Sequence, residues 1–361
     1  MTNKRTCLYD KHVALGALIT PFAGFDMPIQ YTGIIDEHNA VREHCGVFDV
    51  SHMGEVVVSG PDADKYINHI FTNDVNGLAA GKVLYGMICY PDGGVVDDTC
   101  ICKLADQLYL MTINASNIDK DVAWIEQNAE GFNVTIENKS EAYGQLAVQG
   151  PEAEKMLEEV LDLDCKDLKF YEVKCLKQDG VDVIVSRTGY TGEDGFEIYG
   201  TPEYIVKVWD KLMEAGVKPC GLGCRDTLRF EVGMPLYGNE LSDKITPVMA
   251  GLSMFVKFDK DEFIGKEALL KQKKEGVRQR LRGIELDENA IPRHGYKVLK
   301  DGVEVGEVTT GYRLISTDKS CAVALVDESI QMGDRVDIQI RKKTFPGTVV
   351  KKKFYDNHYK K

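Results

Sequence analysis

The sequence predicts an α+β protein of two or three domains, with antiparallel sheets and a small β-barrel at its C-terminal end. Three observations support this prediction. A chain of 361 residues is too long for one small core. Three strand-like runs follow one another between residues 83 and 113, flanked by helical patterns. From residue 278 onward, short strands alternate with glycine and aspartate turns, as in small barrels.

The first 140 residues alternate between helical and strand patterns. Residues 22–31 are apolar and contain turn formers, so a loop is expected there. A helix is expected over residues 35–45, with Gly46 as its stop. Strand character over residues 47–59 is interrupted by the run Ser51-His52-Met53-Gly54. The remaining expected elements are a helix at 61–71, strands at 83–90, 95–104 and 107–113, and a helix at 115–128.

The remainder of the chain continues this alternation and then changes to strands alone. A strand at 145–149 ends at a Gly-Pro turn, and a helix follows it. A strand at 181–186 precedes a helix at 202–215, which has a proline near its start, and a further helix opens over 225–233. The expected barrel strands are 281–286, 297–299, 304–309, 322–326, 335–340 and 348–352.

Composition and charge exclude several classes of protein. Hydrophobic residues make up 43% and charged residues 28% of the chain, as in soluble globular proteins. No apolar run approaches the roughly 20 residues that span a bilayer, and the first twelve residues lack the apolar core of a signal peptide. We therefore expect a cytoplasmic protein with no membrane partner. A net charge of −13 argues against nucleic-acid binding, and the basic stretch 266–282 is interpreted as solvated surface in preference to a docking site.

The ten cysteines do not form a metal-binding or disulfide pattern. There is no C-x-x-C pair, and no His/Cys cluster has zinc spacing. Cys100 and Cys102 alternate on an expected strand and therefore face the same side. We expect free, buried thiols and no metal cofactor.

Residues 187–197 read R-T-G-Y-T-G-E-D-G-F-E. The three glycines allow a tightly folded backbone that approaches a flat ligand closely. Their spacing is neither that of a Walker loop nor that of a dinucleotide loop, and the three carboxylates would repel phosphate. The run therefore predicts a site for a neutral ligand that offers N–H groups to carboxylates and a face to an aromatic ring.

Residues 93–99 read G-G-V-V-D-D-T. Two glycines turn the chain into a strand, in which successive side chains point to opposite faces. One of the two aspartates must then face inward, which is unfavourable unless it has partners or a task. A functional carboxylate and a turn carboxylate that caps local N–H groups are equally supported by this run.

Residues 221–229 read G-L-G-C-R-D-T-L-R, a glycine-rich turn that leads into a helix. Arg225 and Arg229 are one helical turn apart, on one face. Together they can bind a carboxylate bidentately. Pairing with Asp226 and Glu231 is an equally supported alternative.

Seven motifs, in order along the chain, resemble those of the T-protein family, the aminomethyltransferases of the glycine cleavage system. The resemblance extends from Leu8 to Tyr355. The motifs are residues 48–55 (F-D-V-S-H-M-G-E), 93–98, 189–197, 221–229, 236–241, 261–266 and 291–296.

The resemblance implies a three-domain cloverleaf ring around a central hole that holds tetrahydrofolate. Two α/β domains with antiparallel sheets would be joined by a C-terminal β-barrel. The implied folate-binding domain 1 is discontinuous and consists of residues 1–50 and 141–277. Domain 2, residues 51–140, is inserted into it and carries the catalytic aspartate, and domain 3 is the barrel at 278–361.

The resemblance also implies the reaction and the site. The family takes an aminomethyl group from lipoylated H-protein, with P-protein and L-protein as indirect partners, and yields 5,10-methylenetetrahydrofolate, ammonia and the dihydrolipoyl arm. Asp98 is implied as the catalytic carboxylate, either as a base or as a stabiliser of positive charge. Glu197 would bind the pterin edge, whose ring N–H and exocyclic amine suit a carboxylate. The other implied folate-binding residues are Tyr190, Tyr85, Arg225, Asn114, Met53 and Tyr359.

Two positions depart from the family pattern, and two other functions remain open. Met249 stands where the family usually has glutamate, and Met254 where an aromatic residue is common. Neutral repacking is favoured over altered carrier or folate contacts, because methionine adapts to irregular spaces. The alternative functions are a folate-dependent demethylase of a small methylated substrate and a non-catalytic folate-binding protein on the same scaffold.

Overall fold

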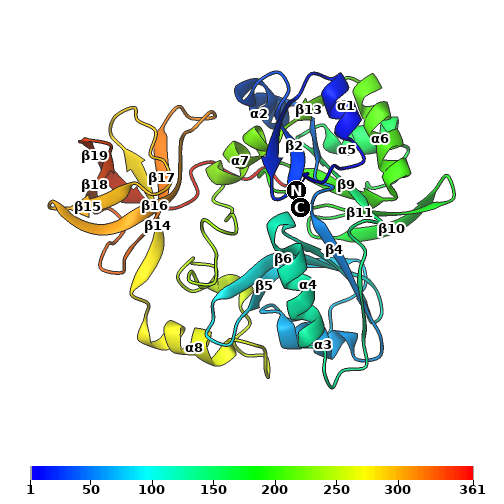
Figure 1. The fold of residues 1–361 in the computed structure, drawn as a ribbon, viewed down its shortest axis with the longest axis horizontal. Coiled ribbons are helices and arrows are strands. Elements are labelled where there is room, and N and C mark those ends of the chain that lie inside the picture. Colours follow the sequence, from blue (N-terminus) through cyan, green and yellow to red (C-terminus); the bar gives the residue numbers. More distant parts are fainter. Residues whose placement is uncertain (1, 361) are drawn as a thin grey trace. The chain divides into compact units, whose positions relative to one another are not determined.

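The computed structural model describes residues 2–360, which divide into two compact units. The first unit comprises residues up to Gly86, residues 99–228 and the segment from Asn357 onward. The second unit comprises residues 87–98 and 229–356. Figure 1 shows the elements of both units along the chain.

The first unit is built on a six-stranded sheet with the order β10-β11-β12-β9-β3-β13. Neighbouring strands are antiparallel except for β13, which runs parallel to β3. The strands are β3 (Gly46–Asp49), β9 (Gly144–Gln149), β10 (Val173–Gln178), β11 (Val181–Ser186), β12 (Gly195–Gly200) and β13 (Lys218–Cys220).

Helices lie on both faces of this sheet: one face packs against the longest helix, and Val41 of the helix Ile34–Glu43 packs with Phe48 and Ala147 on the other. The longest, α6 (Pro202–Glu214), starts at Thr201, whose hydroxyl accepts a hydrogen bond from the Tyr204 N–H at 3.3 Å. Its buried residues recur at helical spacing and pack against alternate residues of the strands. Three shorter helices accompany the first sheet: α1 (Tyr9–Ala14), α2 (Ile34–Glu43), and α5 (Ala153–Lys155), which continues as a wider π-helical turn, Met156–Val160.

A second sheet of five strands has the order β5-β6-β7-β4-β8. Residues 87–98, where β5 ends and β6 begins, are counted with the second unit. One face of the rest of the sheet packs against Val173, Ile184 and Tyr199 of the first sheet. The elements are β4 (Gly54–Ser59), α3 (Ala63–Ile70), β5 (Lys82–Cys89), β6 (Val95–Ala105), β7 (Leu108–Ile113), a 3-10 turn (Ala115–Asn117), α4 (Ile118–Gln127) and β8 (Thr135–Asn138).

The apolar loop expected at residues 22–31 is instead part of a β-hairpin, so that prediction was wrong. The strands β1 (Leu18–Phe22) and β2 (Phe25–Gln30) are antiparallel and are joined at Ala23 and Gly24. Both turn residues have positive φ, 49° and 81°. Alanine rarely adopts this conformation, so the turn lacks the Asn-Gly type of signal that marks a two-residue hairpin.

The second unit contains a closed barrel with the strand order β14-β17-β16-β15-β18-β19, which confirms the predicted C-terminal barrel. Its strand β19 begins at Lys343, five residues before the expected start. The start was not predicted because Pro346 lies close to it, and proline seldom lies within a strand. In the structure, Pro346 pairs in register with Asp337. The barrel strands are β14 (Gln279–Leu286), β15 (Lys297–Lys300), β16 (Val303–Arg313), β17 (Ser320–Asp327), β18 (Arg335–Ile340) and β19 (Lys343–Val350).

Two helices differ from the predictions. The basic stretch that begins at Lys266 forms α8 (Lys266–Glu275), which was not expected as a helix. The helix expected from Arg225 is α7 (Leu222–Glu231) and begins three residues earlier. The predicted class, mixed helices and antiparallel sheets with a C-terminal barrel, is confirmed.

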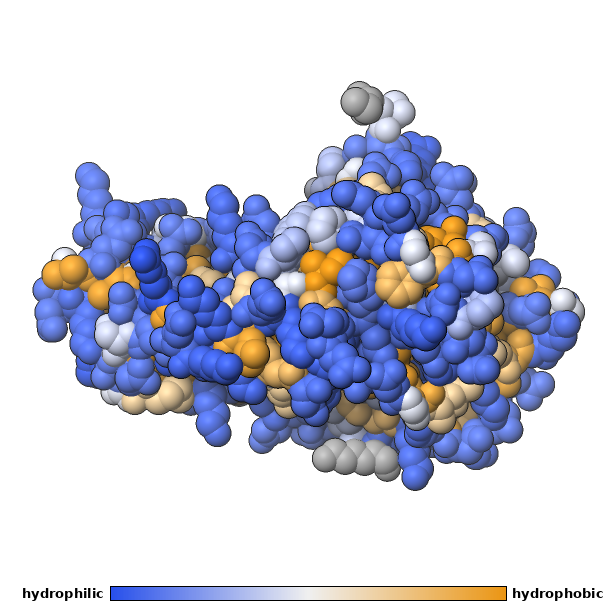
Figure 2. All heavy atoms as spheres, turned by 90° about the horizontal axis from the view of Figure 1, so that it is seen from below, coloured by the Kyte–Doolittle hydropathy of each residue, from blue (hydrophilic) through white to orange (hydrophobic). Residues whose placement is uncertain are grey.

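The surface and the thiols agree with a globular chain. The face drawn in Figure 2 is mostly hydrophilic, with small separated hydrophobic areas. Within residues 2–360, no helix is both long and apolar enough to cross a membrane. The ten cysteines are free; the expectation of buried thiols is confirmed for seven of them, whereas Cys7 and Cys100 are partly exposed and Cys175 is exposed.

Candidate functional site

The candidate site residues share one degree of exposure. Each is partly exposed, neither buried in a core nor fully open to solvent. They are Met53, Tyr85, Asp98, Asn114, Tyr190, Glu197, Arg225 and Tyr359.

Glu197 lies in the middle of β12 and points away from the face of the sheet that α6 covers. Its neighbours Phe196 and Ile198 are fully buried in the core on that face, and strand side chains alternate. Thr188 Oγ1 donates to Glu197 Oε2 at 2.5 Å, and Gln145 Nε2 donates to Oε1 at 3.2 Å. A carboxylate accepts about four hydrogen bonds, so each oxygen keeps capacity for a ligand N–H.

Glu197 is the available carboxylate of the glycine loop. Arg42 Nη1 binds Glu193 at 2.9 Å, and Arg187 binds Asp194 through two nitrogens at 2.9 and 2.6 Å. Glu197 makes no ion pair with any residue in the described part of the chain. Two of the three carboxylates predicted to face a ligand therefore hold the loop together, and one remains for binding.

Two of the loop glycines are required by a neighbouring side chain. A Cβ atom at Gly189 would lie 2.0 Å from Gln149 Oε1, and one at Gly195 would lie 2.4 Å from Gln149 Nε2. The Gln149 amide donates to the Thr188 carbonyl at 3.1 Å and accepts from Thr191 Oγ1 at 2.8 Å. The two glycines thus leave room for the buried Gln149 amide, which hydrogen-bonds to the loop. The sequence alone did not indicate this reason for the glycines.

Arg225 faces the same loop from α7. Its guanidinium carbon lies 4.8 Å from the centroid of the Tyr190 ring, a cation–π contact. Its Nη1 is buried and has no hydrogen-bond partner among residues 2–360. Burial lowers the pKa of this guanidinium, and the nearby carboxylate of Glu197 opposes the shift. A buried donor without a partner is unfavourable, so Nη1 is available to a ligand acceptor.

The sequence left open whether Arg225 and Arg229 bind one carboxylate together or pair with Asp226 and Glu231. Arg229 belongs to the second unit and donates to Glu240 Oε2 at 2.8 Å. Glu240 also accepts from Thr309 and Thr310 at 2.6 and 2.7 Å. This pairing partner, eleven residues further along the chain, was missed because no local spacing indicates it.

His52 and Met53 follow β3, in the turn that leads to β4. Met53 packs against a buried cluster that includes Phe48, Ala147 and Leu228. His52 is 3% exposed, and its Nδ1 has no hydrogen-bond partner in the described structure. Burial lowers the pKa of His52 to about 4, so its imidazole is neutral at pH 7. Sequence reasoning included His52 in a motif but did not propose it for the site.

The C-terminal segment contributes Tyr359. Its ring stacks on Phe170 with centroids 4.1 Å apart and planes 18° apart. Its Oη is buried without a hydrogen-bond partner among the residues described, and burial raises its pKa. The neighbouring His358 N–H donates to the Gly192 carbonyl at 2.8 Å. The structure therefore places the predicted tyrosine beside the glycine loop.

Tyr85 and Asn114 lie on the second sheet of the same unit. Tyr85 is in β5, and its carbonyl accepts a hydrogen bond from Asn73 Nδ2 at 2.9 Å. Asn114 follows β7, and its carbonyl accepts from the Asn117 N–H at 2.9 Å, which starts the 3-10 turn. The structure fixes the backbone of both residues, while their role toward a ligand stays a prediction.

Asp98 is described with the second unit. On β6 the buried aspartate is Asp97, and Asp98 is partly exposed, as strand alternation predicts. A Cβ atom at Gly94 would lie 2.1 Å from the Asp243 carbonyl oxygen, and the Val95 N–H donates to the Ser242 carbonyl at 2.9 Å. The glycine turn is therefore needed for close packing against residues 242–243, which fixes the start of the strand that carries Asp98.

The two methionines that depart from the family pattern also lie in the second unit. Met249 is partly buried, and its carbonyl accepts from the Leu281 N–H at 2.9 Å. Met254 is 72% exposed, so it does not repack a core. Whether either methionine alters carrier or folate contacts stays a question for binding measurements.

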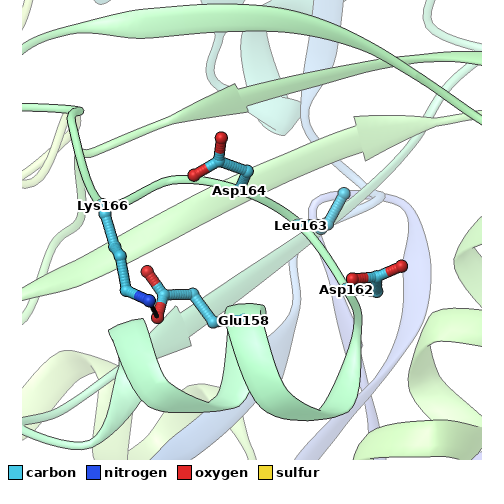
Figure 3. Close-up of a pocket in the computed structure, with 5 residues that line it drawn as sticks. All are labelled: Glu158, Asp162, Leu163, Asp164 and Lys166. Carbon is cyan, nitrogen blue, oxygen red and sulfur yellow. Dashed lines mark ion pairs between the residues drawn. The ribbon is translucent and has the colours of Figure 1, made fainter.

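A small surface pocket lies elsewhere in the first unit. It is lined by an acidic cluster in which Glu158 and Lys166 point toward each other and pair at 2.9 Å (Figure 3). It contains none of the candidate site residues. Within residues 2–360, no group of three or more acidic, histidine or cysteine side chains is arranged to hold a metal ion.

Comparison with known proteins gives a family for both parts of the chain. The model of the GCVT N-terminal domain matches residues 8–260, and that of the glycine cleavage T-protein C-terminal barrel domain matches residues 279–356. An aminomethyltransferase of Caldanaerobacter subterraneus is 49% identical over 364 residues, which cover 99% of this chain and 97% of the relative. An aminomethyltransferase of Lysinibacillus sphaericus is 48% identical, and the match covers 98% of this chain and 99% of the relative.

A solved structure agrees with the sequence matches. The glycine cleavage system aminomethyltransferase T of Bartonella henselae superposes with a TM-score of 0.94 at 31% identity, with 99% of both chains covered. The chain therefore belongs to the glycine cleavage T-protein family. The activity that goes with this membership is aminomethyl transfer in the glycine cleavage system, and the enzyme is a transferase of one-carbon units.

Proposed function

We propose that this enzyme transfers an aminomethyl group from lipoylated H-protein to tetrahydrofolate. The products would be 5,10-methylenetetrahydrofolate, ammonia and the dihydrolipoyl arm. The observation that carries the proposal is the Glu197 carboxylate, which keeps one accepting position on each oxygen beside partner-free buried polar atoms. P-protein and L-protein would act as indirect partners, through H-protein.

The residues around Glu197 fit a folate. A pterin ring presents a ring N–H and an exocyclic amine on one edge, which Glu197 can accept through its two oxygens. Its other edge carries acceptors, which suit the donor Arg225 Nη1. Tyr190 and Tyr359 offer aromatic surface to a flat ring. Met53, Tyr85 and Asn114 are proposed as further contacts.

Tetrahydrofolate, when bound, would supply the nitrogen nucleophile that takes up the one-carbon unit. Asp98 is proposed as the carboxylate that faces the positive charge developing as ammonia leaves, and that holds or accepts a proton there. We further propose the three-domain division inferred from the sequence: residues 1–50 with 141–277, residues 51–140, and residues 278–361. In this division Asp98 belongs to the inserted domain.

Replacement of Asp98 by Asn tests the proposal. The variant keeps the shape of the side chain and removes its charge. With aminomethylated H-protein and tetrahydrofolate, we expect methylenetetrahydrofolate formation to fall by roughly two to four orders of magnitude, the usual size of a proton-transfer or charge-stabilising contribution. Undiminished formation would contradict the role of Asp98.

Small methylated donors separate this function from the demethylase alternative. The wild-type enzyme is assayed with aminomethylated H-protein and, in parallel, with small methylamine and sulfonium compounds. We expect turnover only with the protein-bound donor. Turnover only with a small donor would contradict the proposal, and folate binding without turnover of either kind would favour a non-catalytic role.

A further inference from the structure

Gln145 is a buried residue whose amide nitrogen makes a hydrogen bond and whose amide oxygen makes none in the described structure. It lies on β9, opposite Tyr199 of β12, and is 1% exposed. Its Nε2 donates to Glu197 Oε1 at 3.2 Å. Its Oε1 is buried and has no hydrogen-bond partner in the part of the chain that the structure describes.

The orientation of this amide is fixed by chemistry. A carboxylate oxygen only accepts hydrogen bonds, so the nitrogen of Gln145 must face Glu197. Both atoms belong to one planar amide group, so Oε1 is separated by one bond angle from the nitrogen that contacts Glu197. A buried acceptor without a donor is unfavourable, and a ligand amine at Oε1 would satisfy it.

Thr188 holds the other oxygen of Glu197. Its hydroxyl has a single hydrogen, which is donated to Glu197 Oε2 at 2.5 Å. Ser186 Oγ lies 2.6 Å from Thr188 Oγ1. Ser186 must therefore be the donor in that contact, and the two hydroxyls form a chain of donors that ends on Glu197.

The backbone of Gln145 is fixed from the opposite side. Ser51 Oγ accepts from the Gln145 N–H at 2.9 Å and lies 3.2 Å from its carbonyl oxygen, to which it donates. The Ser51 N–H donates to Asp49 Oδ1 at 2.9 Å. Asp49 Oδ2 accepts hydrogen bonds from His12 Nε2 at 2.9 Å and from Thr6 Oγ1 at 2.6 Å. A continuous hydrogen-bond network thus runs from the buried His12, through the partly exposed Ser51, to the side chain of Glu197.

We propose that Thr188 and Gln145 are positioning residues for Glu197, and that Gln145 Oε1 is a further acceptor for the ligand. Glu197 would accept the ring N–H and one amine hydrogen, and Gln145 Oε1 would accept the second amine hydrogen. The site then selects rings in which a ring N–H adjoins a primary amine. This inference rests on the proposed role of Glu197 in folate binding.

Equilibrium binding of tetrahydrofolate to the purified enzyme, without H-protein, tests the positioning role. Thr188→Val removes the donor and keeps the shape, and we expect the dissociation constant to rise about 10- to 100-fold, as for loss of a hydrogen bond to a charged group. Thr188→Ser restores the donor and should bind within about threefold of wild type on the same reasoning. The exposed Thr344→Val serves as the matched control and should change nothing.

An analogue of tetrahydrofolate without the 2-amino group tests the acceptor role. For wild type we expect its affinity to fall by about 10-fold or more, the loss expected when a hydrogen-bonding site is left unpaired. Gln145→Met keeps the volume and removes the acceptor, so the penalty for the missing amine should shrink. Gln127→Met, on the exposed side of α4, should keep the full penalty.

Three outcomes separate this inference from the proposed function. If Glu197→Gln binds tetrahydrofolate like wild type, the proposed role of Glu197 is wrong. If Glu197→Gln weakens binding while Thr188→Val and Gln145→Met do not, only the positioning inference is overturned. If Thr188→Val and Thr188→Ser weaken binding equally, the hydroxyl does not act as a donor, and the positioning role of Thr188 is overturned.

Discussion

Removal of Asp49 should destabilise the first unit by several kilocalories per mole. Its side chain and that of His12 are fully buried, and their oxygen and nitrogen are 2.9 Å apart. Asp49 also accepts from Thr6 and from the Ser51 N–H, at 2.6 and 2.9 Å. Asp49→Ala leaves these donors without an acceptor. Each buried donor left without an acceptor costs about 1–3 kcal/mol.

The unfolding of these variants can be followed from within the cluster. The Trp209 ring meets the His12 ring edge to face, with centroids 5.3 Å apart. In a Trp124→Phe background, Trp209 is the remaining tryptophan, and its fluorescence reports urea unfolding of this region. His12→Ala removes one of these hydrogen bonds and should lose about 1–3 kcal/mol. The double variant should lose clearly less than the sum, because the two residues share one interaction.

Two results of this double-mutant cycle would refute this reasoning. One is that the losses of Asp49→Ala and His12→Ala simply add. The other is a loss below about 1 kcal/mol for Asp49→Ala, which is what an exposed pair contributes. Folate binding supplies a second readout. Since Asp49 holds Ser51, and Ser51 holds the backbone of Gln145, we also expect weaker binding by Asp49→Ala. Unchanged binding would show that the network does not extend to Glu197.

Three other predictions follow from buried groups and close contacts. Burial raises the pKa of Glu55, whose two oxygens have no hydrogen-bond partner in the described structure; the folded state therefore favours the protonated acid, and its contribution to stability is lost as pH rises through the folded pKa. Glu55→Gln should remove this loss, so its stability relative to wild type in denaturant melts should increase as pH rises. Burial lowers the pKa of His52 to about 4, so between pH 6.5 and 4 the unfolded state binds a proton more readily than the folded state. The free energy of unfolding should therefore decrease by up to about 3 kcal/mol as pH falls from 6.5 to 4. His52→Gln should make the free energy of unfolding less dependent on pH in this range. Gly195→Ala would place a Cβ atom 2.4 Å from Gln149 Nε2 and should cost about 1–3 kcal/mol, whereas adding Gln149→Ala should recover part of the loss of melting temperature.

The sequence predicted those parts of the fold that have a local signature. The consecutive strands from residue 83 to residue 113 and the barrel are present. The β1–β2 hairpin was missed because Ala23 adopts a left-handed conformation that its identity does not suggest. The start of β19 was missed because Pro346 lies inside the strand.

The sequence indicated the kind of ligand that the candidate site would bind, but not which of the loop carboxylates would be left to bind it. The acidity of the glycine loop indicated a donor-rich ligand. Which carboxylate stays available depends on Arg42, which lies about 150 residues away in sequence from Glu193, the residue it binds. Gln145 carried no signal beyond strand pattern, because its importance arises from the register of β9 with β12.

The single-turnover release of ammonia from aminomethylated H-protein tests folate-dependent aminomethyl transfer most directly. The enzyme is mixed with the loaded carrier in the presence and absence of tetrahydrofolate, and ammonia and the folate product are measured together. We predict rapid, equal formation of both with folate, and loss of both in Asp98→Asn and in Glu197→Gln. Ammonia release at the same rate without folate, or with both variants, would contradict the account.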